Sequence, residues 1–180
     1  MPQTHKTNTA LLLAICFAAP VYAADNGCKP VFDAMSRVLV TPTHLYSSET
    51  AAYGGNKPRT GEMIYAGGTN AAIYIFFDAK WIRSKMDAAT MAKQEEENRR
   101  TAKYSCRYVR DEAVNGEAAA VYTSHAEIED LKSDATTWIS KSKGLPLRVE
   151  LDHDPDDPKT KSHTSLRYEY TNVRPPAGVQ

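Results

Sequence analysis

The residues best suited to chemistry lie in one short acidic segment near the C-terminal end. Asp152, Asp154, Asp156 and Asp157 surround His153, and alternating carboxylates can present hard oxygen ligands to a cation such as calcium. The segment lacks the glycine and the closing glutamate of an EF-hand loop, and its two prolines favour a plain connection between strands. We therefore predict no metal site, and metal binding by this loop stays open as the alternative.

Signatures of covalent catalysis are missing from the sequence. It has no G-x-S-x-G elbow, and its histidines show neither HExxH nor zinc-finger spacing. An enzyme would need a cleft that gathers at least two distant polar groups from a small set: His44, Asp111, Glu112 and His125. We predict no catalytic residue and no cofactor, with an unrecognised hydrolase as the enzymatic alternative.

Residues 1–23 have the pattern of a secretory signal peptide. A thinly charged start containing Lys6 precedes a mostly apolar run at 10–19, which is too short to span a bilayer. Val21-Tyr22-Ala23 then offers a small-x-small cleavage site. We expect cleavage after Ala23, export to the periplasm, and one mature domain over 24–180.

The charge of the mature chain argues against a nucleic-acid partner. Lys and Arg balance Asp and Glu at 22 each, and cleavage removes only Lys6, which leaves a formal charge of −1. A nucleic-acid-binding domain would show a basic patch or stripe. We therefore expect no nucleic acid among the partners of this protein.

Two cysteines remain after cleavage, Cys28 and Cys106. An exported protein with two cysteines most simply forms a disulfide, because the periplasm is oxidising. The chain has no C-x-x-C motif, so a structural bridge is favoured over thiol exchange. Such a bridge would join the N-terminal segment to a central strand.

The first part of the chain predicts one helix and several strands. Apolar residues recur at helical spacing from Val31 to Leu39, with Pro30 suited to a first turn, so we expect a helix over 29–40. The period then changes to two, with glycine-bearing turns such as Gly54-Gly55 and Gly67-Gly68. The expected strands cover residues 44–51, 61–66, 71–77 and 81–83.

A second helix is expected over 85–101. Ser84 with Asp87 three positions later resembles a capping box, and the following residues are rich in Ala, Met, Gln and Glu. Glu95 and Arg99 have i,i+4 spacing, as do Glu96 and Arg100, and such pairs are typical of a solvated helix face.

The last third of the chain reads as a long antiparallel meander. Residues 103–114 and 117–128 flank Asn115-Gly116, the strongest short hairpin signal. Further strands are expected at 135–141, 145–152 and 165–173, with a turn at Lys143-Gly144. Sheets this long twist and curl, so something must fill the concave face, and the two helices are suited to do so.

Apolar residues on these strands are the candidate ligand contacts. The strand at 71–77 is apolar on both faces, which is typical of burial between a sheet and a helix and also suits a ligand cavity. An indole can close such a cavity while its N–H finds a polar partner. The candidate ligand-binding residues are Ile64, Ile73, Ile75, Phe77, Trp81 and Trp138.

One segment carries a family resemblance. Residues 138–148, Trp-Ile-Ser-Lys-Ser-Lys-Gly-Leu-Pro-Leu-Arg, place an aromatic strand, a glycine turn and a Leu-Pro strand in succession. With the predicted signal peptide, N-terminal helix and meander, this resembles the LolA-like periplasmic proteins, the outer-membrane lipoprotein carriers and their relatives. The resemblance centres on residues 135–152 and elsewhere covers only the order of elements.

The resemblance implies an incomplete β-barrel closed by helices around an apolar cavity. We therefore predict an α+β fold, a curved antiparallel sheet wrapped around one or two helices, that binds an acyl chain, lipid or lipoprotein without catalysis. The alternative is an envelope regulator or inhibitor that binds a protein partner through its sheet surface and has no cavity. The two differ in whether the inward residues at 65–81 and 138–151 fill the barrel.

Overall fold

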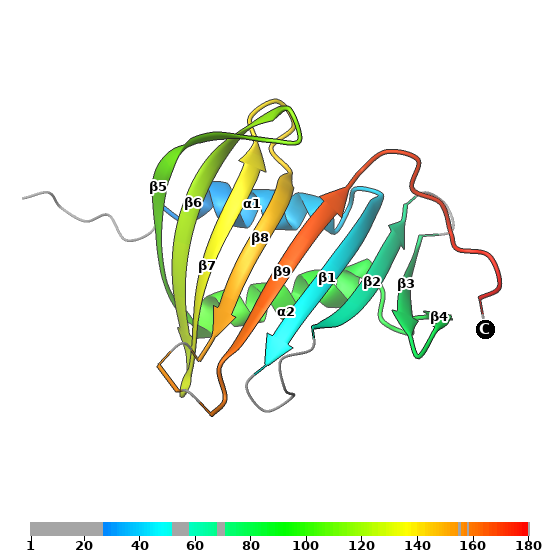
Figure 1. Ribbon diagram of the computed structural model, residues 1–180, viewed down its shortest axis with the longest axis horizontal. Coiled ribbons are helices and arrows are strands. Elements are labelled where there is room, and N and C mark those ends of the chain that lie inside the picture. Colours follow the sequence, from blue (N-terminus) through cyan, green and yellow to red (C-terminus); the bar gives the residue numbers. More distant parts are fainter. Residues whose placement is uncertain (1–26, 52–57, 68–70, 155, 158, 180) are drawn as a thin grey trace, which may run out of the picture.

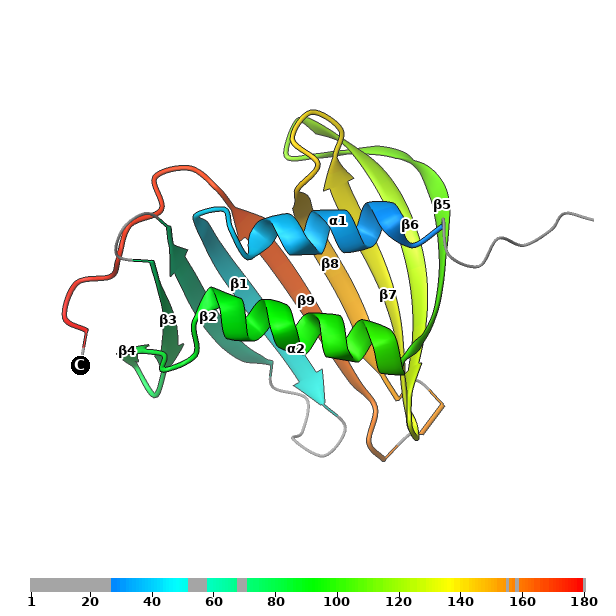
Figure 2. The ribbon, with the colours of Figure 1, turned by 180° about the vertical axis from the view of Figure 1, so that it is seen from behind.

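A computed structural model describes residues 27–51, 58–67, 71–154, 156–157 and 159–179. These residues form one nine-stranded sheet in the order β4-β3-β2-β1-β9-β8-β7-β6-β5. Figure 1 shows the outer face of the curved sheet, and Figure 2 shows both helices lying across the opposite, concave face. The predicted α+β class with a curved, unclosed antiparallel sheet around helices is confirmed.

The sheet consists of two antiparallel meanders that meet in the middle. The first comprises β1 (Thr43–Ala51), β2 (Arg59–Ala66), β3 (Ala72–Phe77) and β4 (Lys80–Arg83). The second comprises β5 (Lys103–Val114), β6 (Glu117–Ile128), β7 (Leu131–Ser140), β8 (Pro146–His153) and β9 (Ser162–Glu169). The last strand, β9, pairs with the first, β1, with Tyr46 opposite Arg167. This pairing turns two separate meanders into one sheet.

Helix α1 (Lys29–Val38) fills the concave face along β5–β9. Pro30 lies in its first turn, and Val31, Ala34 and Val38 are its buried residues. Val31 and Ala34 pack on Ile139 of β7, and Val38 packs in a second cluster with Val149 and Tyr168. Because these residues recur at helical spacing, one stripe of α1 forms the core of this half of the barrel.

A disulfide and a glycine turn hold the two ends of α1. Cys28 precedes the helix and is bonded to Cys106 of β5, which confirms the predicted pair. At the other end Arg37 donates from Nη1 to the carbonyl of Lys143 at 3.1 Å, in the turn between β7 and β8. Gly144 adopts φ +64, a left-handed conformation that favours glycine, and a Cβ there would displace the Arg37 guanidinium, which would lie 2.1 Å away.

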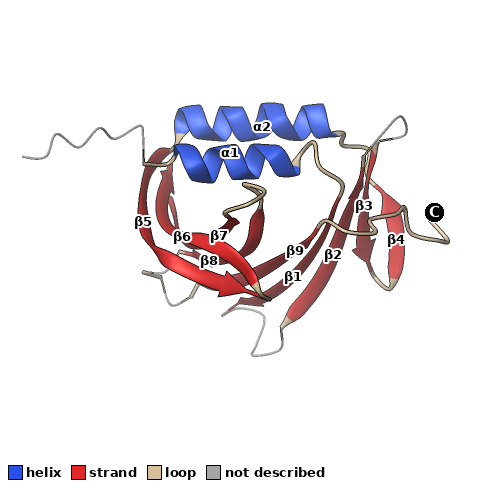
Figure 3. Ribbon diagram, turned by 90° about the horizontal axis from the view of Figure 1, so that it is seen from above, coloured by secondary structure: helices blue, strands red, loops and turns tan. Residues whose placement is uncertain are grey.

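Helix α2 (Ala88–Thr101) lies beside α1 but has no buried residue. It begins later than predicted, because Asp87 and not Ser84 is its N-cap: the Asp87 carboxylate accepts from the Thr90 amide at 2.7 Å. Ser84 instead accepts from the Met86 amide at 3.0 Å, a local turn before the helix. Figure 3 shows both helices bridging the open side of the curved sheet.

The β5–β6 hairpin bends at a β-bulge. Asn115 and Gly116 have positive φ values of 50 and 83, as the predicted Asn-Gly turn requires. The register shifts between Tyr108 and Arg110, and beyond that point the two strands curve across the ends of β7 and β8 (Figure 1). The hairpin end buries Val121 against Trp138, which forms a small core on the outer face.

The remaining boundaries differ from the predictions by a few residues. Strand β7 begins four residues earlier than expected, at Leu131, and β9 runs over 162–169 instead of 165–173. The predicted signal peptide and the Gly54-Gly55 turn lie outside the described residues, as does Gly68. Neither described helix has the length and apolar content to cross a bilayer.

Candidate functional site

An apolar groove opens between the two helices on the concave side. It has a volume of about 280 Å³, near the lower limit for small-molecule sites. Its walls are Met35 and Leu39 of α1, Met86 and Met91 from the start of α2, and a polar rim of Gln94, Glu95 and Asn98. Thioethers and aliphatic carbons line it, so its chemistry favours an apolar ligand over a soluble metabolite.

The groove adjoins a narrow crevice above β2 and β3. The crevice measures about 20 Å³, and its lining includes Val38, Met63, Ile73 and Met91. Met91 therefore lies at both the groove and the crevice. Widening this crevice would require α2 to move away from the sheet, and nothing in α2 is buried to oppose that movement.

One arginine supplies the main polar connection of α2 to α1. Arg99 donates from Nη2 to the carbonyl of Phe32 at 3.2 Å and to the Ser36 hydroxyl at 3.0 Å. Its guanidinium also lies 4.6 Å from the centre of the Phe32 ring, and Glu95 accepts from its Nε at 3.1 Å. The charged face of α2, interpreted from sequence as solvated, is therefore partly a contact with α1.

The structure brings some of the predicted ligand-binding residues to this side. Ile73 is buried and lines the crevice. Ile75 pairs with Met63 across β2 and β3, so it shares the concave face and is 42% exposed. Phe77 follows at the end of β3 and is 69% exposed. A ligand-contact role for these three residues stays a prediction.

The other three predicted residues lie on the outer face of the sheet. Ile64 is adjacent to Met63 along β2 and so points the opposite way. Trp81 pairs with Phe76 on that face, and the centre of its ring lies 6.2 Å from the centre of the His44 ring, edge to face. Trp138 is 7% exposed beneath the end of the β5–β6 hairpin. The structure therefore does not bring these three side chains to the groove.

Sequence reasoning missed the methionines. Met35, Met63, Met86 and Met91 all line the groove or the crevice, and Met1 is the only other methionine in the chain. Met35 recurs with the apolar stripe of α1, and Met91 is the one large apolar residue of α2. The methionines are visible in the sequence, but they lie too far apart along the chain for their spacing to predict that they share one region.

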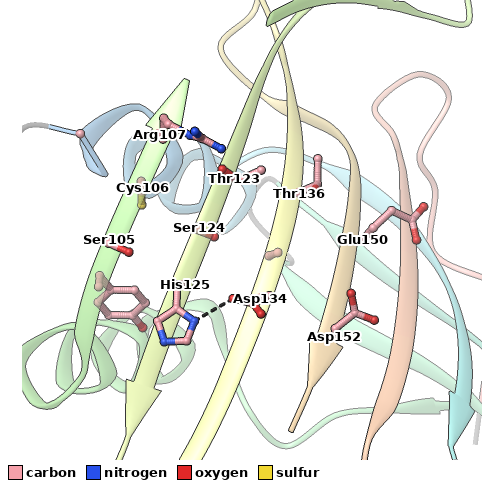
Figure 4. A pocket seen from close by; sticks show the side chains of 13 residues that line it. Ser105, Cys106, Arg107, Thr123, Ser124, His125, Asp134, Thr136, Glu150 and Asp152 are labelled. Atoms are coloured by element: carbon pink, nitrogen blue, oxygen red, sulfur yellow. Dashed lines mark hydrogen bonds and ion pairs between the residues drawn. The ribbon is translucent and has the colours of Figure 1, made fainter. Parts of the chain in front are cut away.

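A second hollow of about 610 Å³ lies on the outer face over β5–β8. Figure 4 shows its polar lining, with His125 of β6 hydrogen-bonded to Asp134 of β7, and Glu150 and Asp152 on β8. The His125 Nδ1 to Asp134 Oδ1 distance is 2.7 Å. Hydroxyl groups of Ser105, Thr123 and Thr136 complete this surface.

Each of two histidines on the outer face lies between two carboxylates. His163 of β9 contacts Asp152 through Nδ1 at 2.8 Å and Glu150 through Nε2 at 2.9 Å. The hydrogen bond that Asp152 accepts from His163 raises the pKa of His163, and the one that Asp134 accepts from His125 raises the pKa of His125. Both effects favour the imidazolium, because a nearby carboxylate stabilises the positive charge.

The described polar residues that were considered as a catalytic set are not gathered in one place. The polar residues considered as a catalytic set form separate ion pairs: His44 with Glu62, Asp111 with Lys141, and Glu112 with Arg110. Over the described ranges, no three His, Cys, Asp or Glu side chains are placed to hold a metal ion. Pro155 and Pro158 of the acidic loop lie outside those ranges.

Comparison with known proteins gives similarity of architecture only. No family model matches the chain, and no curated protein matches it. Among solved structures, MucB aligns with a TM-score of 0.49 and 12% identity, covering 87% of this chain and 62% of MucB, so this chain spans less than two thirds of that protein. LprF from Mycobacterium bovis aligns with a TM-score of 0.44 and 9% identity over 84% of this chain and 97% of LprF.

The similar structures include the group that the sequence suggested. A LolA superfamily protein from Nitrosomonas europaea aligns with a TM-score of 0.30 and 10% identity, covering 79% of this chain and 91% of that protein. No ligand, partner or residue role follows from similarity at this level.

Proposed function

We propose that this protein is an exported, periplasmic binding protein that holds an apolar ligand, such as the acyl chain of a lipid or lipoprotein, without catalysing a reaction. The supporting observation is the groove itself: four methionines and Leu39 converge from α1, β2 and α2 on one side of the sheet. Unbranched thioethers adapt to ligands of varied shape, which suits a flexible chain.

Ligand entry in this proposal depends on α2. The helix has no buried residue, and its polar link to α1 runs mainly through Arg99 near its C-terminal end. Its N-terminal half can therefore lift while the C-terminal half stays attached. An acyl chain entering the widened crevice would gain about 25 cal/mol for each Å² of apolar surface removed from water.

The first test is to look for a bound ligand. We expect native mass spectrometry of protein purified from the periplasm to show a species heavier than the mature chain, and denaturing analysis to release a lipid or acyl-bearing molecule. The same spectrum gives the mass of the mature N-terminus and thereby tests cleavage after Ala23. A clean apo mass, together with no thermal shift on adding a fatty acid or lipopeptide, contradicts the proposal.

A pair of variants on adjacent residues locates the site. Met91→Glu introduces a carboxylate into the groove and crevice, and we expect about tenfold weaker binding of a fluorescent fatty acid. Thr90→Glu introduces the same charge at an exposed neighbouring position that lines neither the groove nor the crevice, and it serves as the matched control. Equal binding by both variants, with unchanged circular dichroism, would place the ligand elsewhere.

The outer hollow supports a second candidate function, binding of a protein partner through the sheet surface. It is larger than the groove, polar, and rich in paired charges, which are features of a wet and transient protein contact. Thr136 lies within it, and a photoreactive amino acid placed there should crosslink a partner in the periplasm. If the groove holds no ligand and Thr136 crosslinks one defined protein, the regulator alternative replaces the carrier.

A further inference from the structure

The sulfur chemistry of the described residues is concentrated at the groove. Both described cysteines are consumed in the Cys28–Cys106 disulfide. The remaining sulfur atoms belong to Met35, Met63, Met86 and Met91, which all line the groove or the crevice. An oxidant that reaches this region therefore meets thioethers and no free thiol.

These methionines differ in exposure. Met86 is 49% exposed in the segment that leads into α2, and Met91 is half-buried where α2 faces the crevice. Met63 lies on the floor of the crevice, which is only about 20 Å³ in volume. Oxidants from solvent therefore reach Met86 first, and Met91 becomes accessible when α2 lifts.

We propose that Met86 and Met91 form an oxidation-sensitive site that controls the groove. A peroxide transfers one oxygen atom to the thioether sulfur of each residue, which is oxidised to the sulfoxide, while the peroxide is reduced to water or an alcohol. The sulfoxide is polar and accepts hydrogen bonds, so it is costly to bury without a partner. Oxidation thus makes the groove polar and makes contact with the crevice less favourable for α2.

The consequence for α2 follows from its composition. Apart from alanines, Met91 is the only apolar residue in the helix, so its thioether supplies most of the apolar surface that α2 can place against the crevice. Sulfoxide formation at Met91 weakens this contact, and α2 opens more often. The effect on ligand affinity rests on the proposed function, whereas the effect on α2 does not.

The experiment treats the full-length mature protein with limiting hydrogen peroxide and maps sulfoxides by peptide mass spectrometry. We expect Met86 to oxidise first, and the partly buried Met35, Met63 and Met91 later. Hydrogen exchange of α2 amides should then become about tenfold faster in the oxidised protein, and binding of a fluorescent fatty acid about tenfold weaker. Treatment with methionine sulfoxide reductases should reverse both changes.

Two double variants serve as controls. Met86→Leu with Met91→Leu keeps an apolar groove and removes the oxidisable sulfur, so its exchange and binding should not change on oxidation. Met35→Leu with Met63→Leu should remain as sensitive as the wild type. If the two pairs respond equally, or if oxidised wild type keeps its α2 protection, the proposal is overturned.

The two readouts separate this proposal from the proposed function. Loss of fatty-acid binding in both redox states, with α2 exchange still increased by oxidation, would reject the acyl-binding function and keep the methionine site. If the reduced protein binds the fatty acid and binding persists after Met86 and Met91 are oxidised, the acyl-binding function is kept and the methionine site is rejected.

Discussion

The two helices cover the same concave face, yet they form different kinds of region. At the α1 end, Val31, Ala34 and Val38 are buried, a disulfide fixes the start of the helix, and Arg37 fastens its end. In α2, no residue is buried, and an apolar groove remains open between the two helices. The same concave face therefore carries one helix that is packed into the core and one that only lies over it.

This difference bears on the two functional alternatives, which differ in whether the inward residues fill the barrel. The inward residues of the second meander do fill it, because Ile139 and Val149 pack directly on α1. The inward residues of the first meander are only partly covered, as the exposure of Ile75 shows. The packed residues and the open groove therefore lie in different parts of the concave face.

Loss of the disulfide should have the largest effect. The bridge closes a sequence separation of 78 residues, and the chain-entropy model assigns it about 4 kcal/mol. We expect Cys28→Ser with Cys106→Ser to lower the unfolding free energy by about that amount in urea titrations. Dithiothreitol should then destabilise the wild type and leave the variant unchanged; equal stability of both would show that α1 is held by packing alone.

Truncation of a core residue of α1 should come next. Val31 is buried against Ile139 and lines neither the groove nor the crevice, so Val31→Ala should cost about 2 kcal/mol, in lost transfer free energy and an unfilled cavity. Fatty-acid binding per folded molecule should change little. A large loss of binding in the folded variant would show that the site extends to the start of α1.

The matched truncation in α2 should cost less although it removes more atoms. Met91 is half-buried, and we expect Met91→Ala to reduce stability by about 1 kcal/mol in the same titration. Its effect on fatty-acid binding should exceed that of Val31→Ala. If Met91→Ala destabilises the fold more than Val31→Ala, the contrast between the two helices is wrong.

The N-cap of α2 should affect the helix locally and depend on acid. The hydrogen bond from the Thr90 amide holds the pKa of Asp87 below its ordinary value of 3.8. This stabilisation is present above the unfolded pKa and is lost as the pH falls through the lower folded pKa. Asp87→Ala should therefore speed amide exchange in the first turn of α2 at neutral pH, and Asp87→Asn should largely preserve protection. Unchanged exchange in Asp87→Ala would mean that packing, not capping, sets the start of α2.

The smallest effect should come from the outer face. Asp152, and to a smaller extent Glu150, raise the pKa of His163 above its ordinary value of 6.5. The protonated histidine therefore stabilises the folded state fully below pH 6.5, and this stabilisation is lost as the pH rises through the folded pKa. We expect the wild-type urea midpoint to fall slightly as the pH rises above 6.5, and His163→Gln to flatten this dependence. A midpoint that rises over this interval would contradict the sign of the effect.

Local signals in the sequence predicted most individual elements. The apolar stripe after Pro30 predicted α1, and Asn115-Gly116 predicted a hairpin whose strands begin and end where expected. The start of α2 was predicted less well, because both Ser84 and Asp87 can cap a helix and only the actual backbone path distinguishes them.

The candidate site was predicted only in part. Alternation along 71–77 suggested Ile73 and Ile75, of which Ile73 lines the crevice, but it did not reveal which face of each strand meets a helix. Ile64, Trp81 and Trp138 were grouped with them by hydrophobicity, although each lies on the outer face. The four methionines have no common spacing, so no periodic pattern connects them.

The sequence by itself determined the disulfide partners, the helix of the core and the hairpins, because each depends on composition or on residues close together in the chain. Export stays a prediction from the sequence. Only the tertiary structure decided that β1 pairs with β9, that the β5–β6 hairpin folds over Trp138, and that three of the methionines share a groove. These features join residues far apart in sequence. They are stabilised by contacts between surfaces that form only when the sheet has curved around α1.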